Sequence, residues 1–266
     1  MTTRIRPVIS LACLTAAVVP HATAAATSTS VTDEDLALAR TPVVIRTRLS
    51  VSNEFTELGA GGHRDKLIAG GVYGFGFDGE HRNIGIGFEM PYWWSDPKGG
   101  ASGSGWGDFK LRYGYLFRGM PEGWRAGLFG DTEFDTAADA VQAAANQRNQ
   151  TSLGAGISMP VADSFVVTTT LQYGWSLDAG ETNGNKSEWE GHVTGTWKAT
   201  DRIAANLDYK VVLNKIGQDE VFNTLEPSVS VTLGADKHIG LWTSLECPLD
   251  NDSTDWVFKV GLNWFF

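Results

Sequence analysis

Cysteine, long apolar runs and positive charge are all scarce in this chain of 266 residues. With only 2 Cys, the chain cannot be a small domain held together by several disulfides. Its formal net charge of −10 argues against nucleic-acid binding, which needs a clustered positive surface. After residue 24, no uninterrupted apolar run approaches the roughly 20 residues that a membrane-spanning helix needs. Disulfide scaffolds, nucleic-acid-binding proteins and helical membrane proteins are therefore excluded.

The N-terminus has the pattern of a secretory signal peptide. Two arginines precede an apolar run over residues 8–19, and small residues at 22–24 form a cleavage pattern. We therefore expect residues 1–24 to be removed on export. Cys247 is then the only cysteine of the mature chain, so no internal disulfide can form.

Large apolar residues alternate with polar ones through the rest of the chain. In the last segment, one face carries Trp256, Phe258, Val260, Leu262, Trp264 and Phe266. Lys259, Gly261 and Asn263 fall on the other face. Because successive side chains point to opposite faces of a strand, this alternation predicts β-strands with one apolar and one polar face.

The same alternation predicts twelve strands, an even number. Their ranges are 43–53, 65–77, 82–92, 107–118, 123–134, 150–159, 164–177, 187–198, 202–213, 220–233, 239–247 and 255–266. Short turns alternate with longer polar loops, which are predicted over 54–64, 93–106, 135–149, 178–186, 214–219 and 248–254. Strands of about ten residues joined in this way are typical of bacterial outer-membrane barrels.

A soluble sandwich would give the same alternation in each strand, so further features must decide between the two folds. The polar faces are rich in glycine and charge, as a crowded water-lined lumen would be. Aromatic residues gather near strand ends, as interfacial girdles do. Those toward the long loops are Tyr92, Trp93, Trp94, Trp175, Trp189 and Trp256, and those toward the short turns are Trp124, Trp197, Trp264 and Phe266. We therefore predict an all-β fold, a closed antiparallel up-and-down transmembrane β-barrel of about 12 strands over 43–266, preceded by a periplasmic N-terminal segment over 25–42.

Two stretches resemble known outer-membrane proteins. The ending, residues 256–266, resembles the terminal strand of Gram-negative outer-membrane proteins, whose final Phe is recognised by the barrel-assembly machinery. Gly105-Trp106-Gly107-Asp108, after a Gly/Ser-rich loop, resembles the G-x-G-D motif of the phenol meta-pathway-associated outer-membrane transporter family. The resemblance implies a place in the cell outer membrane, contact with its lipid bilayer and lipopolysaccharide, assembly through Phe266, and passage of small aromatic or organic solutes.

The polar faces of the predicted strands supply the candidate functional residues. The pore-lining candidates are Arg46, Arg48, Glu89, Lys110, Arg112, Arg118, Arg125, Asp131, Glu133, Glu188, Glu190, His192, Asp208 and Lys210. Glu226 and Glu246 lie farther round the predicted barrel. These residues form either a charged constriction that selects a polar or anionic solute, or a salt-bridged filling of a narrow barrel. The sequence predicts a passive channel for small solutes that is not an enzyme and needs no cofactor or metal.

Three other sites are open to a second interpretation. Asp108 is either a ligand contact or, more in keeping with its glycine neighbours, a loop-anchoring carboxylate. Loop 248–254 is rich in carboxylates, which suit either calcium or water. Glu188 and Glu190 lie about 7 Å apart on one strand face, a spacing also seen in acid/base pairs. We interpret them as lumen charges.

Two other functional classes compete with the channel. A membrane-embedded hydrolase of lipids or esters needs a nucleophile beside a base, and His192 with Thr194 is the available pair. The chain has no G-x-S-x-G motif. The other class is a structural or adhesive barrel with a plugged lumen.

Overall fold

The computed structural model describes residues 31–58, 61–76, 83–99, 102–137, 149–177, 186–213, 221–234, 237–249 and 254–266. The predicted signal peptide lies outside these residues, and so do residues 250–253 of the carboxylate-rich loop. No helix among the described residues is long and apolar enough to cross a membrane.

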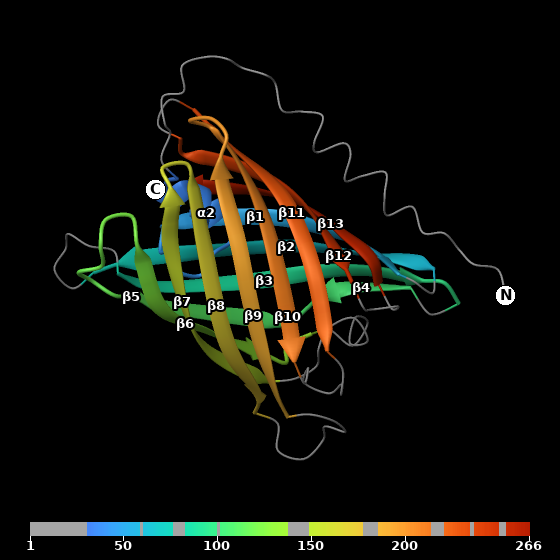
Figure 1. The fold of residues 1–266 in the computed structure, drawn as a ribbon. Helices are drawn as coiled ribbons and strands as arrows, with labels where there is room; N and C mark the ends of the chain where they lie inside the picture. The colour runs from blue at the N-terminus through green and yellow to red at the C-terminus, as the bar shows by residue number, and fades with distance from the viewer. Residues whose placement is uncertain are drawn as a thin grey trace.

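Nearly all of the described chain forms one antiparallel sheet that curls round on itself (Figure 1). The strands are β1 (Arg48–Leu58), β2 (Gly62–Phe75), β3 (Ile84–Pro97), β4 (Gly103–Trp106), β5 (Phe109–Leu116), β6 (Arg125–Phe134), β7 (Gln150–Ala162), β8 (Phe165–Ser176), β9 (Ser187–Lys198), β10 (Ile203–Leu213), β11 (Phe222–Leu233), β12 (Ile239–Pro248) and β13 (Thr254–Phe265). Because β13 pairs with β1 and β2 pairs with β3, the sheet closes on itself as a barrel. Both β4 and β5 pair with the same strand, β3, so together they fill a single strand position in the barrel wall. The 13 labelled strands therefore make 12 positions, and the predicted closed barrel of about 12 strands is confirmed.

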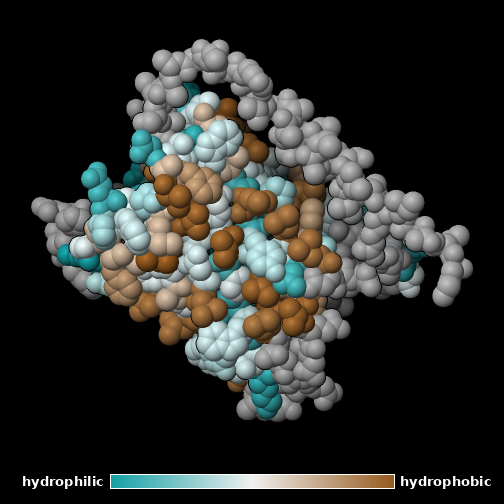
Figure 2. Space-filling view, in the orientation of Figure 1, coloured by the Kyte–Doolittle hydropathy of each residue, from teal (hydrophilic) through white to brown (hydrophobic). Residues whose placement is uncertain are grey.

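The apolar faces point outward and the polar faces inward. Leu153 and Leu171 are more than half exposed, at 52% and 55%, whereas Thr168 and Thr196 on the opposite face are 1% and 0% exposed. Apolar side chains spread over the outer surface of the strands (Figure 2). A soluble sandwich would bury its apolar faces, so this orientation excludes that alternative.

Strand boundaries differ from the prediction at the start of the barrel. The sequence predicts the first strand over 43–53, whereas β1 begins at Arg48 and continues to Leu58. The predicted long loops 54–64 and 93–106 are largely strand, because β2 starts at Gly62 and β3 runs on to Pro97. Both faces of these extensions carry polar residues, so the alternation fades although backbone pairing continues.

The chain before β1 packs against the inner wall of the barrel. Its helix α2 (Asp33–Leu38) begins with a capping box in which Thr32 and Asp35 exchange hydrogen bonds. In Figure 1, α2 lies at the end of the barrel that holds the C-terminus. Leu36 and Leu38 are fully buried, and a Cβ at Gly240 of β12 would lie 2.5 Å from the Leu38 Cδ2 atom. Of the N-terminal segment predicted over 25–42, the structure describes residues 31–42, and α2 within this range contacts β9, β11 and β12.

Candidate functional site in the barrel lumen

The lumen contains a cavity of about 600 Å³ whose lining comes from both the strands and the N-terminal segment. Eleven of the predicted pore residues line it, namely Arg48, Glu89, Lys110, Arg112, Asp131, Glu133, Glu188, Glu190, His192, Asp208 and Lys210. Strand phase alone places these side chains on one face, because the period of a strand is two residues.

Three predicted pore residues do not line this cavity. Arg46 precedes the first residue of β1, so it belongs to the N-terminal segment rather than to the wall. Arg118 lies in the turn after β5 and donates to the Asn83 Oδ1 atom at 3.1 Å. The Nε atom of Arg125 donates to Asp33 Oδ1 at 2.6 Å, so this arginine holds α2 to the start of β6.

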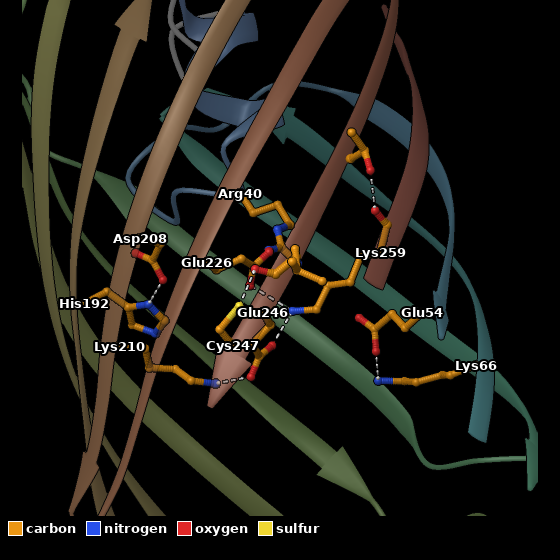
Figure 3. Close-up of polar contacts among 12 residues, drawn as sticks. Arg40, Glu54, Lys66, His192, Asp208, Lys210, Glu226, Glu246, Cys247 and Lys259 are labelled. Atoms are coloured by element: carbon orange, nitrogen blue, oxygen red, sulfur yellow. Dashed lines mark hydrogen bonds and ion pairs between the residues drawn. The ribbon is translucent and has the colours of Figure 1, made fainter. Parts of the chain in front are cut away.

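One ion-pair network of the lumen joins four strands, β10 to β13, and the N-terminal segment. The Lys259 Nζ atom of β13 donates to Glu226 at 2.8 Å and to Glu246 at 2.5 Å. Lys210 of β10 lies 3.9 Å from Glu246. Figure 3 shows Arg40 reaching from the N-terminal segment to the Glu226 carboxylate, with which it forms an ion pair. This network links the N-terminal segment to the wall formed by β10 to β13.

A second cluster surrounds His192 on β9 (Figure 3). Its Nδ1 atom lies 2.9 Å from Asp208 and its Nε2 atom 2.9 Å from Glu190. The imidazolium form, in which both ring nitrogens donate, satisfies both contacts. Thr194 donates to the Asp208 Oδ1 atom at 2.5 Å rather than to the imidazole. The hydrolase alternative needs a nucleophile hydrogen-bonded to its base, and this pair lacks that contact.

On the wall formed by β3, β5 and β6, the charges alternate in sign. Lys110 Nζ lies 3.1 Å from Glu133, and Arg112 Nη2 lies 2.9 Å from Glu89. The strand register places Lys110 directly opposite Glu133, whereas Glu89 is opposite Lys110 and reaches Arg112 diagonally. Opposite charges on directly paired residues stabilise a sheet.

Trp93 differs from its prediction as an outer girdle residue. It lies between Tyr92 and Trp94 on β3, and adjacent residues of a strand face opposite sides. The Nζ atom of Lys66, which lines the cavity, lies 4.9 Å from the centroid of the Trp93 ring. That lysine also donates to Glu54 Oε2 at 3.2 Å. Trp93 is therefore an inner residue, while its two neighbours face outward.

The G-x-G-D stretch marks a break in the wall between β4 and β5. A Cβ at Gly107 would lie 2.4 Å from the Trp93 Nε1 atom, so only glycine fits beside this indole. Asp108 is buried, and its Oδ1 atom accepts the backbone N–H groups of Thr136 at 2.9 Å and Ala137 at 3.0 Å. Asp108 therefore anchors the loop that follows β6, in agreement with its interpretation as a loop-anchoring carboxylate rather than a ligand contact.

Sequence reasoning missed the residues that attach the N-terminal segment. Lys198 of β9 and Asp35 of α2 form an ion pair in which both side chains are 1% exposed. Arg40 lies 4.8 Å from the centroid of the Trp242 ring. Inward strand phase was available as a signal for Lys198, but nothing in the local pattern marks Asp35 or Arg40. Among the described residues, no group of three His, Cys, Asp or Glu side chains is arranged to hold a metal ion.

Comparison with known proteins shows similarity of fold but not of sequence. No protein-family model and no curated protein sequence matches the chain. The chain is similar to an outer membrane channel from Pseudomonas putida F1, with a TM-score of 0.66 and 12% identity over 84% of this chain and 96% of that one. The NanC porin gives a TM-score of 0.60 at 8% identity, covering 81% of this chain and 98% of that one. The CymD monoaromatic hydrocarbon channel gives 0.50 at 9% identity, covering 87% and 93%. The chain therefore has the fold of outer-membrane β-barrel channels.

Proposed function

We propose that this chain is an outer-membrane channel through which small solutes pass by diffusion, and that it is exported through a cleaved signal peptide. The observation that carries the proposal is a closed wall with an apolar exterior around a polar cavity of about 600 Å³. Hydrocarbon cannot satisfy backbone hydrogen bonds, so a β-structure that crosses it must close on itself. The sheet meets this condition through the pairing of β1 with β13.

The outer surface supports contact with the lipid bilayer and lipopolysaccharide of the outer membrane. Exposed aromatic rings lie at both ends of the barrel, as at Trp106 and Trp189 near one end and Trp264 near the other. Phe266 is 52% exposed, and its ring centroid lies 5.9 Å from that of Trp264. We expect this outward-facing C-terminal aromatic pair to be the feature recognised by the barrel-assembly machinery.

Small organic molecules, aromatic or anionic, are the proposed solutes. The three similar structures are named as a channel, a porin and a monoaromatic hydrocarbon channel, which supports diffusion of small molecules. Rings of charged side chains select solutes in channels, and the lumen here carries both signs within one cavity. Arg112 is the most accessible of the paired lumen cations, with 47% of its side chain exposed.

Conductance measurements on the purified protein in planar bilayers, together with liposome swelling, test this function. We expect discrete conductance steps and solute-dependent swelling. Reversing charge with the pair Lys110→Glu and Arg112→Glu should raise the preference for cations while heat-modifiable gel migration stays intact. Arg202→Glu, which changes an exposed arginine paired with its neighbour Asp201 in a turn, is the matched control. A folded barrel with neither conductance nor swelling would refute the channel.

A further inference from the structure

Arg48 differs from the other cations that line the lumen cavity, because it forms no salt bridge with a described carboxylate. The remaining cations of the lining each contact at least one, and they are Arg40, Lys66, Lys110, Arg112, His192, Lys210 and Lys259. An unmatched charge in a partly enclosed site is unfavourable unless a partner or water compensates it. Arg48 therefore offers a positive charge to whatever enters the lumen.

The strand register places Arg48 in one row with Arg112. Arg48 is opposite Val72 on β2, Val72 is opposite Gly87 on β3, and Gly87 is opposite Arg112 on β5. All four residues line the cavity. The row spans three strand spacings, or about 14 Å along the wall. Between the two arginines the wall carries one short apolar side chain and one residue with no side chain, which leaves a shallow recess.

The N-terminal segment closes this recess on the side of α2. Ile45 lies against β3, where a Cβ at Gly85 would be 3.1 Å from the Ile45 Cγ2 atom. On the other side of the row, Glu89 binds Arg112 at 2.9 Å. The recess thus has an apolar floor of Val72 and Ile45, cationic ends, and one carboxylate that is already engaged.

We propose that this arginine recess, formed by Ile45, Arg48, Val72, Gly87 and Arg112, binds small organic monocarboxylates with a flat apolar body. The solute carboxylate pairs with the Arg48 guanidinium, whose planar fork of donors matches a carboxylate. The apolar body lies over Val72 and Ile45, and Gly87 presents no side chain to it. This proposal rests on the proposed channel function and names the solute class that the channel would favour.

The charge of the recess selects a monoanion over a dianion. Glu89 binds Arg112 and Asp131 is opposite Arg112 on β6, so Arg48 is the cation of the recess that has no salt bridge with a described carboxylate. A single carboxylate neutralises it, whereas a second carboxylate would face the apolar floor. A neutral molecule of the same shape lacks the ionic contact and should pass without saturation.

Benzoate is a suitable probe, with benzamide as its neutral counterpart. The full-length protein is placed in planar bilayers, and benzoate permeation is measured against concentration. We expect saturation in the wild type and a rise of about tenfold in the half-saturating concentration for Arg48→Gln, the size expected for the loss of one charged hydrogen-bonded pair. Lys66→Gln is the matched control, because it removes one lumen cation of the same charge at a different site. Benzamide permeation should not saturate and should be unaffected by either variant.

The outcomes separate this proposal from the channel proposal. Equal half-saturation in Arg48→Gln and Lys66→Gln, in a conducting barrel, would overturn the arginine recess and leave the channel standing. If the wild type does not conduct, the channel proposal fails, and equilibrium dialysis of benzoate against the detergent-solubilised protein replaces permeation. If Arg48→Gln weakens benzoate binding and Lys66→Gln does not, the result would support the arginine recess. If both variants bind benzoate with equal affinity, the result would overturn it. If Arg48→Gln does not fold, as judged by the loss of heat-modifiable migration, Arg48→Lys is the replacement variant. It keeps the positive charge but lacks the planar guanidinium, so it should still raise the half-saturating concentration of benzoate.

Discussion

Replacing Lys198 with Met should loosen the N-terminal segment from the barrel. Lys198 and Asp35 are each 1% exposed and bind one another, so the variant leaves a buried carboxylate without its cation. Removing one partner of such a pair costs about 3–5 kcal/mol. Asp35 keeps two contacts from Thr32, at 2.8 and 2.9 Å, which places the cost near the lower end of that range.

Release of the segment would relieve this cost, because Asp35 would regain water. Exposure of Leu36 and Leu38 opposes release, at about 1.5–3 kcal/mol for each side chain. A change of about 3 kcal/mol raises the released population by roughly a hundredfold. The segment contributes to the lining of the cavity, so a released segment should also increase conductance.

Thiol labelling measures this release directly. Ala37 is 2% exposed, and a cysteine placed there in a Cys247→Ser background should react slowly with a membrane-impermeant reagent. Lys198→Met should raise the labelling rate by up to about a hundredfold, and adding Asp35→Asn should restore much of the protection, as a double-mutant cycle requires. Lys186→Met, at an exposed lysine, is the control. Unchanged labelling and conductance in Lys198→Met would refute the claim that this ion pair holds the segment.

Four further substitutions test the wall, the lumen and the C-terminus. Gly107→Ala should lower thermal stability, because the new Cβ would lie 2.4 Å from the Trp93 Nε1 atom, and a melting temperature equal to wild type would contradict this. Asp108→Ala should cost about 1–3 kcal/mol in unfolding free energy by removing a charged acceptor from two partly buried loop amides, and a loss below about 0.5 kcal/mol would count against the anchoring role. His192→Gln removes a cation that lies between two carboxylates and should raise the cation-to-anion permeability ratio about fivefold, for roughly 1 kcal/mol; a ratio that falls or stays constant would argue against a lumen position in the ion path. Phe266→Ser should reduce the amount of protein in the outer membrane without changing the conductance of assembled barrels, and normal assembly would remove Phe266 from the recognition signal.

The wall could be predicted because lipid and lumen impose opposite chemistry on alternate residues. The strand predicted over 187–198 coincides with β9, whose exposed Trp189 and Val193 alternate with the buried Thr194 and Thr196. Phase also placed most of the predicted pore residues correctly, since eleven of the fourteen line the cavity. The prediction from strand phase is wrong at Trp93. It places three consecutive aromatic residues on the outer face, although a strand turns the middle one toward the lumen.

The path of the N-terminal segment could not be predicted, because its signals are short or distant. Helix α2 has 6 residues, too few to show an amphipathic period. The ion pair of Arg40 with Glu226 joins positions separated by 186 residues, and nothing local in the sequence specifies such a partner. Partners across the lumen depend on how far the strands are staggered round the barrel, a quantity that alternation does not contain.

The seam between β1 and β13 has a consequence for when the protein can fold. Its register runs from Arg48 opposite Phe265 to Leu58 opposite Thr254, so it joins the first and last strands of the barrel. Until β13 pairs with β1, the growing sheet has two open edges that invite pairing with other molecules. Contacts of such long sequence separation also form slowly. The wall can therefore be completed only once both of these strands are present, and its open edges need protection until then.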